Sequence, residues 1–145
     1  MDDIETMLQE LGTVSGDATL AEMQGMTAEL GDAIAQLAEE ELQAGRSSAA
    51  RVILEGLVVT NHRDAGAWAL LSTVHRKLEQ PLAARFCAEV AAKLAPGDPW
   101  VRLVRAESLL GRAEEREGAR AELAALAPDA EVGSRARALL GALGG

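Results

Sequence analysis

The sequence predicts an all-α protein, and three observations support this. Alanine, leucine, glutamate and arginine, which are strong helix formers, dominate the chain, whereas aromatic residues make up 2% of it. Apolar residues recur at spacings of three and four, which is the spacing of one helix face. Turn signals recur after 34 residues, at Asp64 and Asp98, as expected of stacked helix pairs. The 145 residues are enough for one domain with its own core.

The pattern divides the chain into an acidic helical segment, three helix pairs and a final helix. We expect the segment at 1–30, the repeats at 31–64, 65–98 and 99–129, and a capping helix at 131–143. The helices of the first repeat are predicted at 31–44 and 47–60, those of the second at 65–78 and 81–95, and those of the third at 99–110 and 114–126. Asp64 and Asp98 stand where helix N-caps belong, and Pro99 suits the first helical position.

Charge and hydropathy exclude several classes of partner. The formal net charge is −9, and residues 1–30 carry seven acids without one Lys or Arg. Such a surface repels nucleic-acid phosphates and anionic membranes. No run approaches the ~18 apolar residues of a membrane helix, and the first residues lack the features of a signal peptide. The single cysteine cannot form an intramolecular disulfide, which is compatible with a reducing compartment. We therefore expect a soluble cytoplasmic protein that neither binds nucleic acid nor inserts into membranes.

The period of 34 resembles the tetratricopeptide repeat. That repeat places a small residue in its first helix opposite a small residue in its second, because the two helices cross closely. Ala38 and Ala50 match this pattern in the first repeat, as do Ser72 and Ala84 in the second, each pair twelve residues apart. Trp68 holds a signature position between the helices and is expected in the core. The resemblance implies three helix pairs in a right-handed solenoid with a concave groove.

Two positions depart from the repeat pattern, and the alignment of the second helix in the third repeat remains undetermined. His62 stands where a proline usually ends the first repeat, and Arg105 replaces a bulky apolar residue in the third. In the third repeat, Ala106 is predicted to face either Gly118 or Ala119, which leaves the start of the second helix undetermined.

A narrower resemblance covers about residues 20–126. The segment Met26-Thr27-Ala28-Glu29-Leu30, the turn Asn61-His62-Arg63-Asp64 and the stretch Arg105-Ala106-Glu107-Ser108-Leu109-Leu110 are similar to class II type III secretion chaperones, the translocator chaperones. That resemblance implies a cytoplasmic protein, often dimeric through its N-terminal helix. It also implies a groove that holds an extended, proline-containing segment of a hydrophobic translocator. The family tends to place tyrosines in this groove, whereas Glu39 and Leu42 stand at those positions here.

The groove-facing positions follow from the repeat as the second, fifth, ninth and twelfth of each first helix. These positions also include Asp32 and Gly66. The candidate peptide-binding residues among them are Ala35, Glu39, Leu42, Ala69, Thr73, Arg76, Trp100, Leu103, Glu107 and Leu110. Arg76 and Glu107 are candidates to hydrogen-bond a guest backbone. Trp100 either anchors the guest or packs on the second repeat, and each of these positions has the alternative of a solvated helix face.

The N-terminal segment has apolar residues at helical spacing and needs a surface to bury them. It can dock on its own repeats, form a dimer or fold on a client. Family analogy favours the dimer, with Met7, Leu8, Leu11, Leu20 and Met23 as the candidate contacts.

The sequence offers little for catalysis, and we expect no enzyme and no cofactor. His62 and His75 are thirteen residues apart, whereas two histidine ligands on one helix need about four. Cys87 lies among apolar neighbours, as a buried structural thiol does. Three hypotheses follow: a secretion chaperone, a generic scaffold with a folded partner, and, least favoured, a metal or redox enzyme that uses these three residues.

Overall fold

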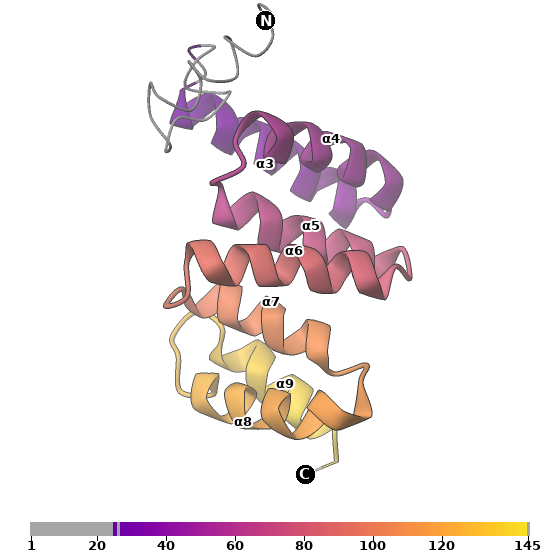
Figure 1. Cartoon of the computed structure of the whole chain (residues 1–145), viewed down its shortest axis with the longest axis vertical. Coiled ribbons are helices and arrows are strands. Elements are labelled where there is room, and N and C mark those ends of the chain that lie inside the picture. Colours follow the sequence, from indigo (N-terminus) through magenta and orange to yellow (C-terminus); the bar gives the residue numbers. More distant parts are fainter. Residues whose placement is uncertain (1–24, 26, 145) are drawn as a thin grey trace, which may run out of the picture.

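The computed structural model describes residue 25 and residues 27–144, and it confirms the all-α fold (Figure 1). This part of the chain contains no strand and forms seven α-helices with one 3₁₀ turn. Their bounds are α3 Ala28–Gln43, α4 Ser47–Thr60, α5 Ala65–Lys77, α6 Pro81–Leu94, α7 Pro99–Leu109, the turn η1 Ala113–Glu115, α8 Arg116–Leu126 and α9 Gly133–Ala142.

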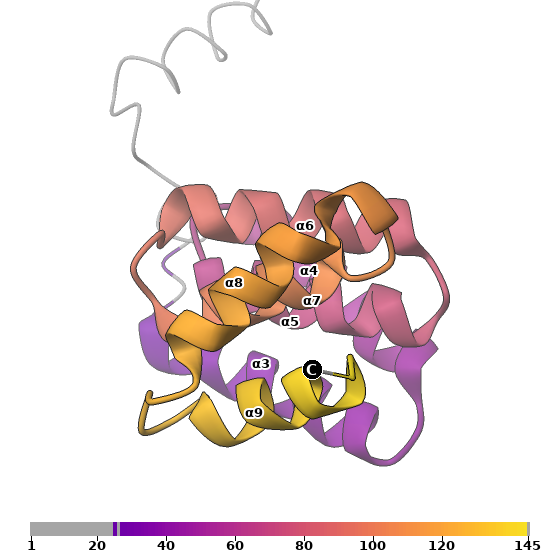
Figure 2. The same ribbon diagram turned by 90° about the horizontal axis from the view of Figure 1, so that it is seen from below.

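The helices form an elongated stack of antiparallel pairs in two layers. Seen along the long axis, α4, α6 and α8 lie on one side, and α3, α5 and α7 lie on the other (Figure 2). The last helix, α9, lies on the same side as α3 but at the opposite end of the molecule (Figures 1 and 2). This layer therefore begins with α3 at one end of the molecule, and α9 extends it at the other end.

Carboxylate and hydroxyl caps determine where several helices begin. The Asp64 carboxylate accepts the backbone N–H three residues on, at 2.9 Å, and Asp98 accepts the N–H groups two and three residues on. Thr27 caps α3 in the same way, so this helix begins at Ala28, three residues before the expected start. Thr27 was not predicted as a cap because residues up to 30 were expected to belong to the N-terminal segment.

The close helix crossings rely on small residues. Ala38 and Ala50 are fully buried in one cluster between α3, α4 and α5. At the next crossing, the buried Ser72 hydroxyl donates to the backbone carbonyl of Ala84 at 2.7 Å. Larger side chains at these positions would push the paired helices apart. The packing that the resemblance implied at both crossings is present.

The third repeat differs by one residue in its register. Ala119 is fully buried and Gly118 is exposed, so Ala119 is the small residue of α8. The turn η1 precedes α8 and accommodates the additional residue. Arg105 lies beside the outer layer, where its guanidinium pairs with Glu89 of α6 at 3.0 Å. This contact explains why a charged residue is tolerated at that position.

Trp100 connects the buried clusters into one continuous core. One cluster lies between α3, α4 and α5, a second between α5, α6 and α7, and a third between α7, α8 and α9. The Trp100 ring packs against all three clusters. Trp68 is half-buried, donates its indole N–H to the His62 carbonyl at 2.8 Å and packs edge-on against Phe86.

Candidate peptide-binding groove

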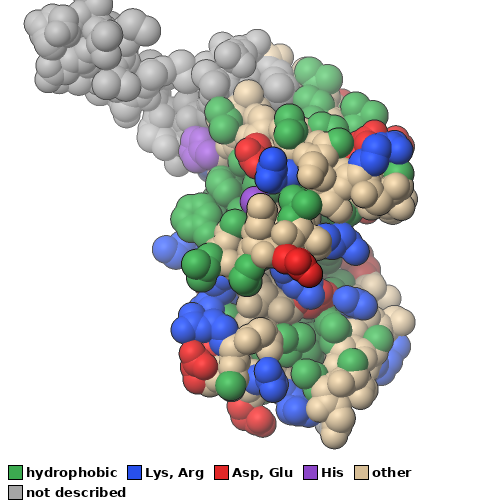
Figure 3. Space-filling view, turned by 90° about the vertical axis from the view of Figure 1, so that its right-hand side faces the viewer, with side chains coloured by type: hydrophobic (Ala, Val, Ile, Leu, Met, Phe, Trp, Pro, Cys, Tyr) green, Lys and Arg blue, Asp and Glu red, His purple; other side chains and the backbone are tan. Residues whose placement is uncertain are grey.

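A groove with a cavity volume of about 990 Å³ lies along the side of the molecule that carries α3, α5, α7 and α9. Figure 3 shows this side hollowed between the N-terminal helices and the C-terminal ones. The groove is lined by Glu39, Leu42, Gln43, Leu70, Thr73, Arg76, Lys77, Glu79, Gln80, Pro81, Ala84, Trp100, Leu103, Val104, Glu107, Ser108, Leu110, Gly111 and Arg135. Its residues thus come from every first helix, from the start of α6 and the turn before it, and from α9.

The structure brings eight of the ten candidate residues together on this groove. They are Glu39, Leu42, Thr73, Arg76, Trp100, Leu103, Glu107 and Leu110. Ala35 is half-buried and packs against the first core cluster instead. Ala69 is fully buried between α5, α6 and α7, so no guest side chain can reach it. The fixed count fails at Ala69 because this position of α5 packs against α6 and α7, whereas Thr73 and Arg76 of the same helix do line the groove.

The floor of the groove is apolar. Leu70 and Leu103 are almost completely buried, yet both line the cavity. Leu42, Trp100 and Leu110 are half-buried beside them. Burying one leucine or valine of a guest against such a surface contributes about 1.5–3 kcal/mol. Two or three such anchors, reduced by the cost of ordering the guest, are typical of micromolar affinity.

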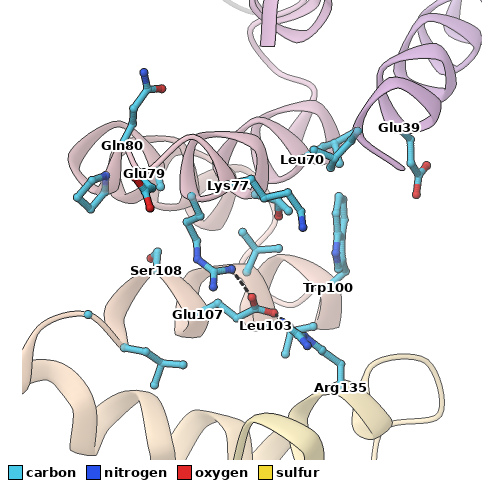
Figure 4. Close-up of a pocket in the computed structure, with 18 of the residues that line it drawn as sticks. Glu39, Leu70, Lys77, Glu79, Gln80, Trp100, Leu103, Glu107, Ser108 and Arg135 are labelled. Carbon is cyan, nitrogen blue, oxygen red and sulfur yellow. Dashed lines mark hydrogen bonds and ion pairs between the residues drawn. The ribbon is translucent and has the colours of Figure 1, made fainter. Parts of the chain in front are cut away.

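A cluster of three charged residues lies in the middle of the groove. The carboxylate of Glu107, 9% exposed, accepts hydrogen bonds from Arg76 of α5 and from Arg135 of α9, the latter at 3.4 Å (Figure 4). A buried carboxylate needs such partners, because desolvation would otherwise disfavour its charged form. Arg76 and Glu107 therefore bind each other, whereas their sequence positions made each a candidate to hydrogen-bond a guest backbone.

Several groove residues were not predicted. Arg135 belongs to the capping helix, which carries no repeat signature, and only its position beside α7 brings it to Glu107. Leu70 and Lys77 lie on α5 outside the four counted positions. Because a guest-facing surface depends on how helices curve around it, position counting alone could not find these residues.

A second, smaller hollow lies among α6, α7 and α8 and is occupied by ion pairs. Its volume is about 280 Å³, and Glu89, Arg102, Arg105 and Glu122 are among its lining residues. Nearby, Arg85 donates to Glu115 at 2.9 Å and to Glu89, and its bond to Glu115 is the main reason that the pKa of Arg85 is raised. The pairs Arg85–Glu115 and Arg105–Glu89 connect the second repeat to the third, and the pair Arg102–Glu122 connects α7 to α8.

The described residues show no arrangement for metal chemistry. They contain no group of three or more His, Cys, Asp or Glu side chains that could hold a metal ion. His75 Nδ1 lies 2.6 Å from the Gln80 amide oxygen, and Cys87 is buried in the first core cluster. The residues named for the redox hypothesis, His62, His75 and Cys87, thus lie on three separate segments of the chain.

Two expectations concern parts of the chain beyond the groove. The candidate dimerisation residues Met7, Leu8, Leu11, Leu20 and Met23 lie outside the described residues. None of the helices that the structure describes combines the length and hydropathy needed to span a bilayer.

Comparison with solved structures finds the same fold in type III secretion proteins. The translocator chaperone SycD of Yersinia enterocolitica has a TM-score of 0.73 at 22% identity, over 86% of this chain and 98% of SycD. A chain of a type III secretion complex from Aeromonas hydrophila has a TM-score of 0.72 at 24% identity, over 96% of this chain and 93% of that one. PcrH bound to the chaperone binding region of PopD has a TM-score of 0.65 at 24% identity, over 81% and 93%.

Other structures of these neighbours contain bound partners or a dimer. SycD has been solved with a peptide of the translocator YopD and also as an alternative dimer, and PcrH with the chaperone binding region of PopB. No protein-family model matches the present sequence, and no curated protein matches it. At these identities the likeness establishes the helix-pair fold of the chain.

Proposed function

We propose that this protein is a cytoplasmic chaperone of type III secretion that holds an extended segment of a hydrophobic translocator in its groove. The observation that carries the proposal is an apolar floor between α3 and α9, open along one side and large enough for a peptide. The peptide complexes of SycD and PcrH, which have the same fold, support this use of the groove. The chaperone keeps the translocator soluble until export, so it performs no catalysis.

The groove contributes to this function by covering apolar side chains of the client. A translocator segment exposed to water would aggregate or insert early into a membrane, because its apolar surface gains free energy when removed from water. Leu42, Trp100 and Leu110 are half-buried and accessible from the groove, so they are the contacts that we propose for guest anchors. The binding is non-covalent and reversible, which lets the client leave for export.

Binding of translocator peptides tests the proposal directly. The YopD peptide bound by SycD and the PopD region bound by PcrH are suitable fluorescent probes, and we expect micromolar dissociation constants by fluorescence anisotropy. Thr73→Arg places a bulky cation in the groove and should weaken binding at least tenfold. Ala124→Arg, at an exposed position of α8 in the other layer, should leave it unchanged.

Co-expression supplies the second test. A candidate translocator that is insoluble alone should become soluble when it is co-expressed with this protein, and Thr73→Arg should abolish the effect. If the client stays insoluble and a folded protein is bound equally well by wild type and Thr73→Arg, the alternative of a generic tetratricopeptide scaffold replaces the chaperone hypothesis. Circular dichroism of both variants verifies that they retain the helical fold.

A further inference from the structure

The charged residues of the groove are arranged with acidic side chains at its two ends and mostly basic side chains in its middle. Glu39 on α3 and Glu79 after α5 lie at opposite ends of the site, and the side chains of Lys77 and Arg135 reach toward its middle from opposite walls (Figure 4). The middle therefore contains the cations Arg76, Lys77 and Arg135 and one carboxylate, that of Glu107. This local excess of positive charge contrasts with the formal net charge of −9 of the whole chain.

Glu107 holds the two guanidinium groups in place without neutralising both. It is 9% exposed and pairs with Arg76 through Nη1 and with Arg135 through Nε. An arginine offers five N–H donors, so each guanidinium retains donors beyond the one given to Glu107. The Arg135 side chain is 57% exposed and that of Arg76 is 33% exposed, which leaves both accessible to a ligand.

The apolar floor of the groove increases the preference of these arginines for a carboxylate over a neutral group. Leu70, Trp100 and Leu103 line the cavity around the cations. Charge-assisted hydrogen bonds are stronger where apolar groups exclude water, and arginine recognises carboxylates through two parallel bonds. A guest side chain that brings one carboxylate among apolar neighbours therefore fits the site better than an amide of the same shape.

We propose that the groove selects guest segments in which one Asp or Glu lies between apolar anchors, and that Arg135 together with Arg76 binds that carboxylate. This inference rests on the proposed function, because it specifies which extended segments the groove accepts. It makes α9 part of the recognition site, with Arg135 as a specificity-determining residue. The net charge of −9 disfavours guests with many acids, so one acid among apolar residues is the expected pattern.

Selection from a random library of displayed 12-residue peptides tests the inference. Wild-type protein should enrich one Asp or Glu at a fixed position between apolar residues. Synthetic versions of an enriched peptide, with Asp or Asn at that position, should differ about tenfold in dissociation constant, as expected for one charge-assisted bond. The preference should weaken at high salt, because ions screen the charges.

Variants at position 135 then test whether Arg135 supplies the positive charge that binds the peptide carboxylate. Arg135→Met leaves the Arg76–Glu107 pair in place and should reduce the Asp-to-Asn difference to less than about threefold. Arg135→Glu should reverse the preference toward Lys or Arg at the same peptide position. Lys93→Met removes one positive charge beside the smaller hollow, which shares no residue with the groove, and should behave like wild type.

The outcomes separate this inference from the function on which it rests. If wild-type protein enriches apolar peptides without an acid, or if Arg135→Met and Lys93→Met behave alike, the acidic selectivity is wrong while peptide binding stands. If wild-type protein enriches no peptide and binds neither translocator probe, both the proposed function and the selectivity are wrong.

Discussion

Single side chains in this molecule connect its stability to its groove. Trp100 packs against all three core clusters and also lines the cavity, so one ring contributes to the fold and to the proposed binding surface. Ser72 is the polar counterpart at the α5–α6 crossing, where its hydroxyl satisfies a carbonyl in a space too small for a large residue. Changes at Trp100 are expected to alter both folding and binding, whereas changes at Ser72, which does not line the groove, are expected to alter folding.

Ser72→Leu should destabilise the protein by about 1–3 kcal/mol, because the larger side chain overpacks the close crossing with Ala84. Urea unfolding followed by circular dichroism measures the free energy of unfolding. Ser48→Leu, at an exposed position of α4, is the matched control and should change stability by less than ~0.5 kcal/mol. Equal unfolding midpoints for the two variants would show that the crossing tolerates bulk.

Cys87 should be unreactive in the native protein. Burial, assisted by the negative charge of Glu55, raises the pKa of its thiol to about 11. At pH 8 only about a thousandth of the thiol is then ionised, and the thiolate is the reactive form. A chromogenic disulfide reagent should label Cys87 within minutes in denaturant but only very slowly without it. Rapid stoichiometric labelling of the folded protein would contradict this buried environment.

The elements differ in how strongly the sequence specifies them. Helices α5 and α7 begin at aspartate caps and could be predicted to within one residue. The α8–α9 connection also contains an aspartate, Asp129, whose carboxylate accepts the backbone N–H groups of Glu131 and Val132 at 2.8 and 3.0 Å. The helix α9 nevertheless begins at Gly133, two residues after the predicted start, and supplies Arg135 to the groove. Gly133 lies at the start of α9, where a Cβ would clash with the backbone carbonyl oxygen of Ala127. The close approach of α9 to the end of α8 thus depends on a residue without a side chain.

Two glycines of α9 should respond oppositely to replacement by alanine. Gly133→Ala should destabilise the protein by about 1–3 kcal/mol, because backbone atoms must move to accept the Cβ. Gly141→Ala meets open space and should stabilise by roughly 0.5–1 kcal/mol, since alanine favours the helix. Thermal unfolding of both variants measures the difference, and a stabilising Gly133→Ala would show that the connection is less tight than the structure indicates.

At the scale of the whole molecule, the α3–α4 pair forms an end of the stack with an apolar surface. Leu30 and Leu37 on α3 and Val52 and Val59 on α4 are each at least half exposed, and each pair is seven residues apart on one helix face. Solenoids need polar caps at their ends to stay in solution. This end therefore needs a cover, which the proposed dimer contact through the acidic N-terminal segment would supply.

The full chain should accordingly form a dimer that depends on its N-terminal apolar residues. The double variant Met7→Glu with Leu11→Glu should give a mass near 15.2 kDa by light scattering coupled to size exclusion, and the wild type about twice that value. Leu82→Glu, at an exposed position of α6, is the control and should remain dimeric. A dimer that persists in the double variant would place the contact elsewhere.

The predictable and unpredictable parts of the structure have different physical origins. The small residues at Ala38, Ala50 and Ala84 could be recognised because the helix pair constrains each locally, within twelve residues. Ala69 was placed wrongly in the groove because its burial depends on packing against two other helices, α6 and α7. Arg135 was missed because its partner lies 28 residues away on another element. Local spacing predicts the repeat, whereas the charge pattern of the groove arises from tertiary packing.

The position of α9 limits what the groove can accommodate. In an open array of repeats, a long ligand can continue past the last repeat and add contacts as it goes. Here α9 lies on the same side as α3 and contributes Arg135 to the lining of the groove. If the groove holds a client as proposed, the client segment would meet α9 at this end, and only a short stretch of the client would be covered. The remainder of a large client would then depend on its own folding or on additional surfaces for protection.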